Sequence, residues 1–394
     1  MKLLFYRYGS ICEPDVIAGF QELGHSVLEI TAEITNKSLA PQEAVQLVSN
    51  TLFEHPSDFV FSINFFPFLA EVCNIFKIPY LCWSVDSPVM ELFSTSITHS
   101  WNRIFLFDRA QYDEIAPLNP GHVFHLPLAV NITQKQNAVN AASSAVRSKF
   151  SSDISFVGSL YTEKCPYDKL KNPPAYLSGY LDGLLEAQLR IYGGFILEEV
   201  LTDQIIDQFK AHLPGFYSYP FDSYLTDRMT MAQLYMGSKV SAMERLRIMK
   251  LLSEQFSVNL YTASDTSKLP KIRNCGLAKT MEEMPVIFHN SKINLNITAK
   301  SIRSGLPLRI FDILGCGGFV LTNFQPELPE FFVPGKDLAC YESIEDLICK
   351  ADYFLCHDAE RREIAQQGFE TVQTYHTYPI RLEQMLGMAF QGSF

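Results

Sequence analysis

The feature that constrains this chain most is the alternation of short apolar runs with longer stretches of helical periodicity. In the first 130 residues, apolar runs of strand length occur at 3–6, 25–30, 58–64, 79–85, 103–108 and 122–128. Between several of them, apolar residues recur at helical spacing, as in 41–53. Short strands that alternate with helices predict βαβ units and a parallel sheet.

The same alternation returns in the second half of the chain. Strands are predicted at 153–161, 258–262, 292–298 and 318–323, with helices at 243–254, 282–289 and 308–314 and a helical end from 343. Residues 165 to about 240 are aromatic, have a helical pattern and contain no clear strand. We therefore predict a second parallel sheet that carries a helical insertion.

The length of 394 residues fits two domains. We predict an α/β protein with two doubly wound, Rossmann-like domains that face a cleft. The N-terminal domain covers 1–131, a polar linker 132–152, and the C-terminal domain 153–375 with its insertion at about 165–240. A final helix in 376–394 is expected to cross back to the N-terminal domain. Ligands of such sheets bind at the carboxyl ends of the strands.

Composition excludes several classes of function. The net charge is −11 and no basic domain is present, which argues against nucleic acid as a partner. No apolar run approaches the ~18 residues of a membrane span. The nine cysteines are scattered without a CxxC pair, which favours reduced thiols and a cytoplasmic protein. The histidines have no metal-ligand spacing and no DxD occurs, so we expect neither a metal nor another cofactor.

The most informative segment is GLPLRIFDILGCGGFVLTN, residues 305–323. Its helix carries Arg309 and Asp312 three residues apart, on one face. The small residues Ser304 and Gly305 precede the helix and allow its first amides to approach an anion. Asp312 could accept from ribose hydroxyls, and Gly317 and Gly318 turn the chain into the next strand. The combination suits a nucleoside diphosphate, although an ordinary helix–turn–strand crossover remains open.

This segment resembles the C-terminal domain of GT-B glycosyltransferases, in the group that includes CgeB-type spore-maturation proteins with an uncharacterised N-terminal domain. Asp312 stands at the second acidic position of the related Glu-x7-Glu motif, and Ser304 stands where those enzymes have the first Glu. FVGSLYTEKC, residues 156–165, resembles their diphosphate-binding loop. Gly158 is shared, Ser159 replaces the Arg, and Lys164 stands at the Lys position.

The resemblance extends over nearly the whole chain and implies an activity. It implies metal-independent transfer of a hexosyl or N-acetylhexosaminyl group, with retention, from a nucleoside diphosphate sugar to a protein or glycan acceptor. UDP is the nucleotide expected. A nucleotide-sugar 2-epimerase and a non-catalytic nucleotide-sugar-binding or structural protein are the alternatives, and Ser159 and Ser304 favour the latter. The oligomeric state stays open.

Further site residues follow from position. Asn296 ends a strand that should face the cleft. Arg303 and Arg309 are candidate phosphate partners because a guanidinium fork suits phosphate, and pairing of either with an acid remains open. Asp86 follows the fourth strand at its carboxyl end, where an acid could act as base or orient the acceptor. Lys164, Arg309 and Asp86 are the predicted catalytic residues. Gly158, Ser159, Asn296, Arg303, Ser304, Asp312, Gly317 and Gly318 are the predicted donor-binding residues.

Overall fold

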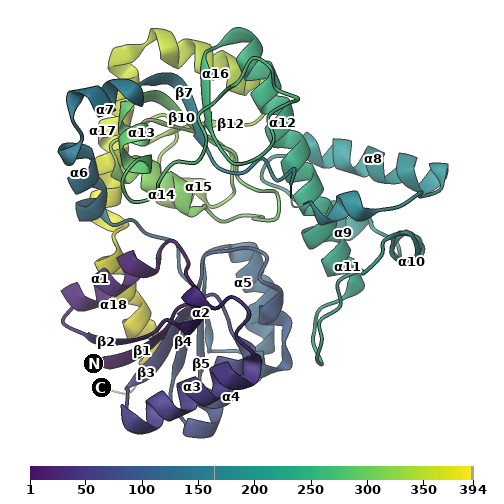
Figure 1. The fold of residues 1–394 in the computed structure, drawn as a ribbon. Coiled ribbons are helices and arrows are strands. Elements are labelled where there is room, and N and C mark those ends of the chain that lie inside the picture. Colours follow the sequence, from purple (N-terminus) through teal and green to yellow (C-terminus); the bar gives the residue numbers. More distant parts are fainter. Residues whose placement is uncertain (164, 392–394) are drawn as a thin grey trace. The chain divides into compact units, whose positions relative to one another are not determined.

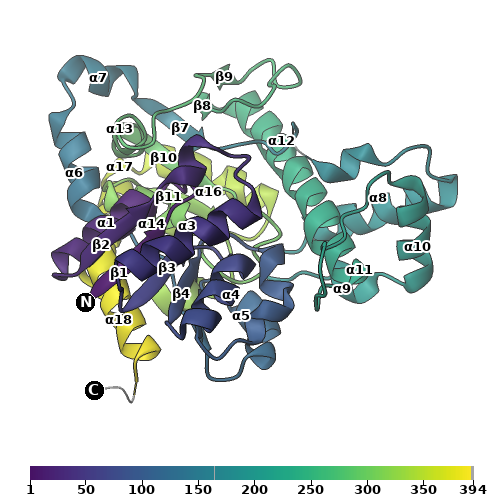
Figure 2. The same cartoon turned by 60° about the horizontal axis from the view of Figure 1, so that its bottom comes forward.

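The chain folds into two compact units. The computed structural model describes residues 1–163 and 165–391. Unit 1 comprises Met1–Asn131, the short segment Tyr219–Leu225 and the segment that begins at His376. Unit 2 comprises Ile132–Ser218 and Thr226–Tyr375. Each unit is built on its own six-stranded parallel sheet (Figures 1 and 2).

The sheet of unit 1 has the order β2-β1-β3-β4-β5-β6. Leu3 lies opposite Val27 on one side and Phe59 on the other, so the strand order reverses between β1 and β3. The central strands are buried along their whole length, as expected for a parallel sheet covered on both faces. The strands are β1 (Lys2–Tyr6), β2 (Ser26–Ile30), β3 (Phe59–Ile63), β4 (Tyr80–Ser84), β5 (Asn102–Leu106) and β6 (Val123–His125).

The helices of unit 1 follow from apolar spacing. In α3, Pro41 occupies the first turn, and Ala44, Val48 and Leu52 recur every four residues and are buried. The last helix, α18, packs on α1 at Gly19, where a Cβ would lie 2.8 Å from Leu382. The helices are α1 (Glu13–Glu22), α2 (Ala32–Thr35), α3 (Pro41–Glu54), α4 (Pro67–Phe76), α5 (Arg109–Ile115) and α18 (Tyr378–Ala389), with 3-10 turns η1 (Met90–Phe93), η2 (Thr95–Thr98) and η3 (Ala116–Leu118).

The sheet of unit 2 has the order β12-β11-β10-β7-β8-β9. From β7 the chain adds two strands on one side and then returns to place β10 on the other. The topological switch point therefore lies between β7 and β10, and ligands of doubly wound sheets bind at the carboxyl ends of such strands. The strands are β7 (Ser152–Val157), β8 (Val258–Tyr261), β9 (Arg273–Asn274), β10 (Ser291–Asn296), β11 (Val320–Asn323) and β12 (Ala339–Tyr341).

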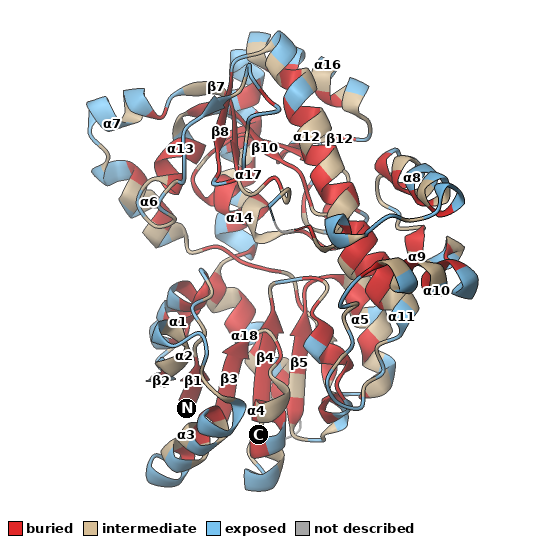
Figure 3. Ribbon diagram, turned by 45° about the vertical axis from the view of Figure 1, so that its right-hand side comes forward, coloured by how far each residue is buried: buried red, intermediate tan, exposed pale blue. Residues whose placement is uncertain are grey.

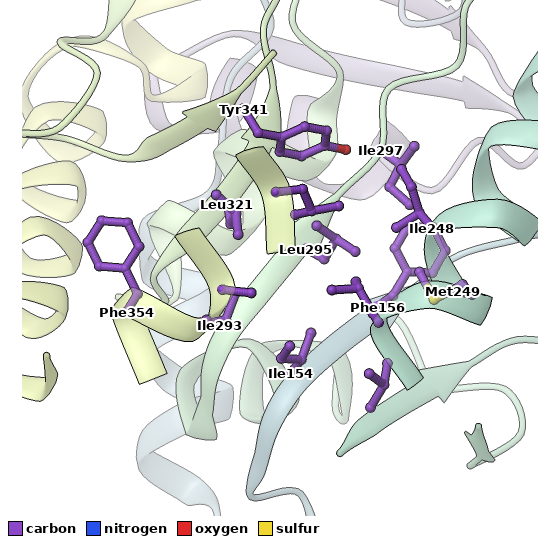
Figure 4. Close-up of a cluster of buried hydrophobic side chains, with 14 of the residues drawn as sticks. Ile154, Phe156, Ile248, Met249, Ile293, Leu295, Ile297, Leu321, Tyr341 and Phe354 are labelled. Carbon is purple, nitrogen blue, oxygen red and sulfur yellow. The ribbon is translucent and has the colours of Figure 1, made fainter. Parts of the chain in front are cut away.

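The core of unit 2 packs around β7 and β10. Ile154, Ile293 and Leu321 come from three neighbouring strands and are almost fully buried, and helices cover both faces (Figures 3 and 4). Phe156 and Ile297 belong to this core and lie at the carboxyl ends of β7 and β10. The core thus supports the ends of β7 and β10 at the switch point.

The predicted linker 132–152 folds into α6 and α7 and the first residue of β7. The predicted insertion is helical, and α8 to α11 extend to one side of α12 (Figure 2). The helices are α6 (Ile132–Ala141), α7 (Ser144–Lys149), η4 (Pro166–Lys169), α8 (Ala175–Leu189), α9 (Leu197–Val200), α10 (Asp203–His212), α11 (Asp227–Met229), the π-helix η5 (Thr230–Met236), α12 (Gly237–Gln255), α13 (Met284–Asn290), α14 (Leu308–Gly315), α15 (Leu328–Phe331), α16 (Ile344–Cys356) and α17 (Asp358–Tyr375).

Across the described part of the chain, none of the helices combines the length and the apolar character that crossing a membrane requires.

Candidate functional site in unit 2

A hollow opens at the switch point of the second sheet. Its water-accessible volume is about 260 Å³, and the ends of β7 and β10 form its floor. A pocket that encloses a whole small-molecule ligand usually has roughly 300–1,000 Å³. The hollow therefore suits one part of a larger ligand. Its lining includes Gly158, Ser159, Tyr161, Arg245, Asn296 and Arg309.

Arg245 reaches the hollow from α12. The residue is 8% exposed, and its Nη1 and Nη2 donate to the carbonyl oxygens of Ser159 and Ile297, both at 2.6 Å. The guanidinium also lies over the Tyr161 ring, 4.3 Å from its centroid. Among the described residues its Nε has no hydrogen-bond partner. One side chain thus links the loop after β7 to the loop after β10, and its Nε–H is left to donate to a ligand.

Arg309 enters the same hollow from the first turn of α14. Its side chain is 23% exposed, and Nη1 lies 3.9 Å from Asp312 Oδ2 and 4.0 Å from Met284 Sδ. Burial lowers the pKa of this guanidinium from its ordinary value; the Asp312 carboxylate opposes the shift, and the nearby Arg245 adds to it. Arginine nevertheless stays protonated in proteins. Two positive charges therefore repel each other at this hollow.

The start of α14 adds to the same positive field. The N-cap residue is Pro307, which lines the hollow and has no side-chain group that could cap the helix. Amide groups at a helix N-terminus, together with the helix dipole, favour an anion. The loop at Gly158, the guanidinium groups of Arg245 and Arg309, and the start of α14 therefore meet at the carboxyl edge of the sheet. Chemically, this arrangement can hold a diphosphate.

The β7 loop uses its own serine for its turn. Ser159 Oγ accepts from the Tyr161 amide at 2.8 Å and donates to Glu163 at 2.9 Å. Residue 159 therefore brings no guanidinium to this loop, and the guanidinium that contacts the loop is that of Arg245, which donates to the Ser159 carbonyl oxygen. The predicted Lys164 lies outside the described residues.

The remaining donor-binding predictions divide between the hollow and its surroundings. Asn296 lines the hollow, while its Nδ2 donates to Thr298 at 3.0 Å and to Thr322 at 2.9 Å. Ser304 Oγ donates to Glu327 at 2.7 Å. Ser304 and Arg303 both lie in the β10–α14 connection, outside the set of residues that line the hollow.

Asp312 points toward α6. One carboxylate oxygen lies 3.1 Å from Lys135 Nζ, and the two side chains are 8% and 6% exposed. The other oxygen makes the longer contact with Arg309. Asp312 is outside the lining of the hollow, so in this structure its contact with the site passes through Arg309.

Gly317 and Gly318 lie at the opposite end of the sheet. They follow α14 and precede β11, and they line a second hollow beside His289 and Lys292. Gly317 has a φ of +70°, which glycine adopts readily at a helix end. The structure therefore brings Gly158, Ser159, Asn296 and Arg309 together and leaves Gly317 and Gly318 apart from them.

Gly318→Ala is expected to destabilise the protein by about 2 kcal/mol because the added methyl overpacks a tight site. A Cβ there would lie 2.5 Å from the Phe288 carbonyl oxygen and 2.8 Å from Asn294 Nδ2. Chemical denaturation measures the loss. Gly183→Ala in α8 is the control, since its Cβ meets nothing within 4 Å. A Gly318→Ala protein of parental stability would contradict the packing role.

Asp86 belongs to unit 1 and follows β4. It is exposed, and its Oδ2 accepts from Asn64 Nδ2 at 2.7 Å. Asn64 follows β3 with a φ of +58° and also donates to the Tyr8 hydroxyl at 3.0 Å. Polar side chains from the ends of three strands thus gather at the carboxyl edge of this sheet.

Arg245 of unit 2 lines the hollow and was not among the site residues predicted from the sequence.

Unit 2 is a doubly wound parallel sheet with an arginine-lined hollow at its switch point, which is the place where sheets of this architecture bind ligands. The comparisons narrow this class. Residues 244–387, which include Arg245 and Arg309, match the family model described as glycosyl transferase-like. A search of curated proteins found no match to the chain.

Solved structures share the fold over the full chain. A glycosyltransferase from Rickettsia africae is 10% identical with a TM-score of 0.58, and the match covers 99% of this chain and 98% of that one. HepE of Anabaena, solved with UDP-glucose, is 11% identical with a TM-score of 0.54 and 98% coverage of both chains. Sucrose-phosphate synthase of Thermosynechococcus elongatus is 11% identical with a TM-score of 0.55, covering 99% and 98%.

These matches establish the fold as that of the GT-B glycosyltransferases, two parallel six-stranded sheets flanked by helices. The predicted fold class and the resemblance to this group are confirmed. The CgeB-like subgroup and the nature of the N-terminal domain stay predictions.

Proposed function

We propose that this protein transfers a sugar from a nucleoside diphosphate sugar, with UDP as the nucleotide, to a protein or glycan acceptor. The observation that carries the proposal is the convergence of Arg245 and Arg309 on one hollow at the switch point of unit 2. A GT-B relative of the same fold was solved with UDP-glucose, which supports a UDP-sugar donor.

The proposed mechanism depends on charge. As the bond between the sugar and the diphosphate breaks, negative charge grows on the leaving UDP. Preorganised cations and amides stabilise such charge most when water is excluded. Arg245 and Arg309 would supply the cations, and the start of α14 would supply oriented amides. We propose on this basis that transfer needs no metal ion.

The finer parts of the proposal come from the family resemblance. They are a hexosyl or N-acetylhexosaminyl donor and retention at the anomeric carbon. Asp86, hydrogen-bonded to Asn64, is proposed to face the acceptor. The scattered cysteines favour a reducing compartment, so the activity is placed in the cytoplasm.

A thermal-shift screen of the purified protein against UDP, GDP, ADP, CMP and dTDP sugars tests the proposal. A UDP-sugar should raise the unfolding temperature, because a ligand at a hundredfold excess over its Kd stabilises the folded state by about 2.7 kcal/mol. UDP release in the presence of a chelator then tests metal independence. A protein that none of these donors stabilises would refute the proposal, and release that stops on chelation would refute its metal-free form.

A further inference from the structure

The β10–α14 connection, residues 297–307, forms one wall of the hollow, and α12 holds its backbone. The Ile297 carbonyl oxygen accepts from Arg245 at 2.6 Å. Three residues later, the Lys300 amide donates to Ser241 Oγ, also on α12, at 2.9 Å. The wall is therefore attached to the helix that carries one of the two site cations.

The Lys300 side chain turns away from the hollow into the protein. Its Nζ lies 3.1 Å from Glu244 Oε1 and 3.3 Å from the Ile191 carbonyl oxygen, and 4.0 Å from the centroid of the Tyr192 ring. The Lys300 and Glu244 side chains are only 8% and 1% exposed. This is a buried ion pair directly behind the wall of the site.

Stability alone does not account for such a pair. Removing two charges from water costs so much that apolar residues of similar volume are often as stabilising. Unlike an apolar contact, the pair attracts two particular groups to each other, and it holds Lys300 Nζ 3.1 Å from Glu244 Oε1. Glu244 precedes Arg245 on α12, so the pair fixes the connection relative to the backbone that carries Arg245.

We propose that Glu244 and Lys300 are positioning residues for the diphosphate hollow. They hold the β10–α14 connection where Arg245 and the start of α14, with Arg309, reach the same anion. This inference rests on the proposed function, because it assigns the pair a purpose at the proposed donor site. Neither side chain touches the donor.

The test is the double variant Glu244→Met/Lys300→Met in the full chain. Removing both charges together avoids a lone buried charge, so the variant should unfold near the parental temperature. Its Kd for UDP and for inorganic pyrophosphate, measured by calorimetry, should rise at least about tenfold. A tenfold rise corresponds to a loss of about 1.4 kcal/mol of binding free energy. Similar losses for both ligands would locate the effect at the diphosphate.

The control is Arg247→Met/Glu186→Met. This pair also links α12 to a neighbouring helix, but its side chains are 38% and 42% exposed, away from the hollow. It should leave both Kd values within about twofold of the parent, as expected for an exposed pair.

Lys300→Arg gives a second measurement. It keeps a charge opposite Glu244, so its UDP affinity should lie between those of the parent and the double variant. If the double variant does not fold, a Lys300→Arg protein with parental affinity for both ligands overturns the inference. A folded double variant with parental affinity does the same and leaves the proposed function standing. A parent that binds neither ligand overturns both.

Discussion

Arg309→Met is expected to lower kcat/KM for sugar transfer by about 100-fold or more while the protein stays folded. Removing one preorganised group that stabilises developing negative charge typically costs 10²–10³ in rate, about 2.7–4 kcal/mol. The polar contacts of Arg309 with the protein are long, at 3.9 Å to Asp312 and 4.0 Å to Met284, and its guanidinium lies 5.1 Å from the centroid of the Phe288 ring. The unfolding free energy should therefore change by less than about 1 kcal/mol.

The matched control is Arg362→Met on α17. This arginine is 78% exposed and pairs with Asp358, so its loss should change neither stability nor transfer. Arg309→Lys should fall between parent and Arg309→Met, because lysine keeps the charge but loses the planar fork. UDP release and calorimetric UDP affinity measure the series. If the Arg309→Met protein transferred sugar at the parental rate, Arg309 would have no part in the reaction.

The sequence predicted the two sheets well because their central strands are continuous apolar runs. β3 and β4 are buried at every position, which is the pattern that a covered parallel strand requires. The strands that it missed, β9 and β12, have two and three residues, too few to show any periodicity. β9 is exposed as well, so it carries no apolar signal.

The site was only partly predictable for a different reason. Gly158 and Arg309 stood out because each lies beside a strand end or helix start that the local pattern reveals. Arg245 sits in the middle of α12, where an arginine ordinarily faces solvent. Its burial comes from the two loops that it bridges, at Ser159 and Ile297, 86 and 52 residues away in the sequence. Local periodicity predicts which face of a helix is buried, but it does not predict which distant residues contact that face.

The same limit applies to Asp312. Its spacing from Arg309 correctly placed the two side chains on one face of α14, and their nearest charged atoms are 3.9 Å apart. The spacing could not reveal Lys135 of α6, which approaches the carboxylate to 3.1 Å. A carboxylate that binds ribose hydroxyls has to face the nucleotide, whereas a carboxylate paired with Lys135 faces α6. Substitutions distinguish these two roles.

Asp312→Ala is expected to destabilise the protein by about 3 kcal/mol. It removes the carboxylate beside a lysine whose side chain is 6% exposed, and breaking one half of a buried ion pair typically costs 3–5 kcal/mol. Denaturant unfolding measures the loss. Asp203→Ala is the control, because Asp203 is 91% exposed and its pair with Arg228 should contribute under about 1 kcal/mol.

Lys135→Met/Asp312→Leu then separates the two roles. Without either charge, the unfolding free energy should return to within about 1 kcal/mol of the parent, since apolar pairs often replace buried ion pairs at no cost. Because Asp312 lies outside the lining of the hollow, UDP affinity should fall less than tenfold. A stable double variant that lost UDP affinity a hundredfold would instead show that Asp312 binds the nucleotide, as the family resemblance implies, and that the Lys135 contact gives way when the donor arrives.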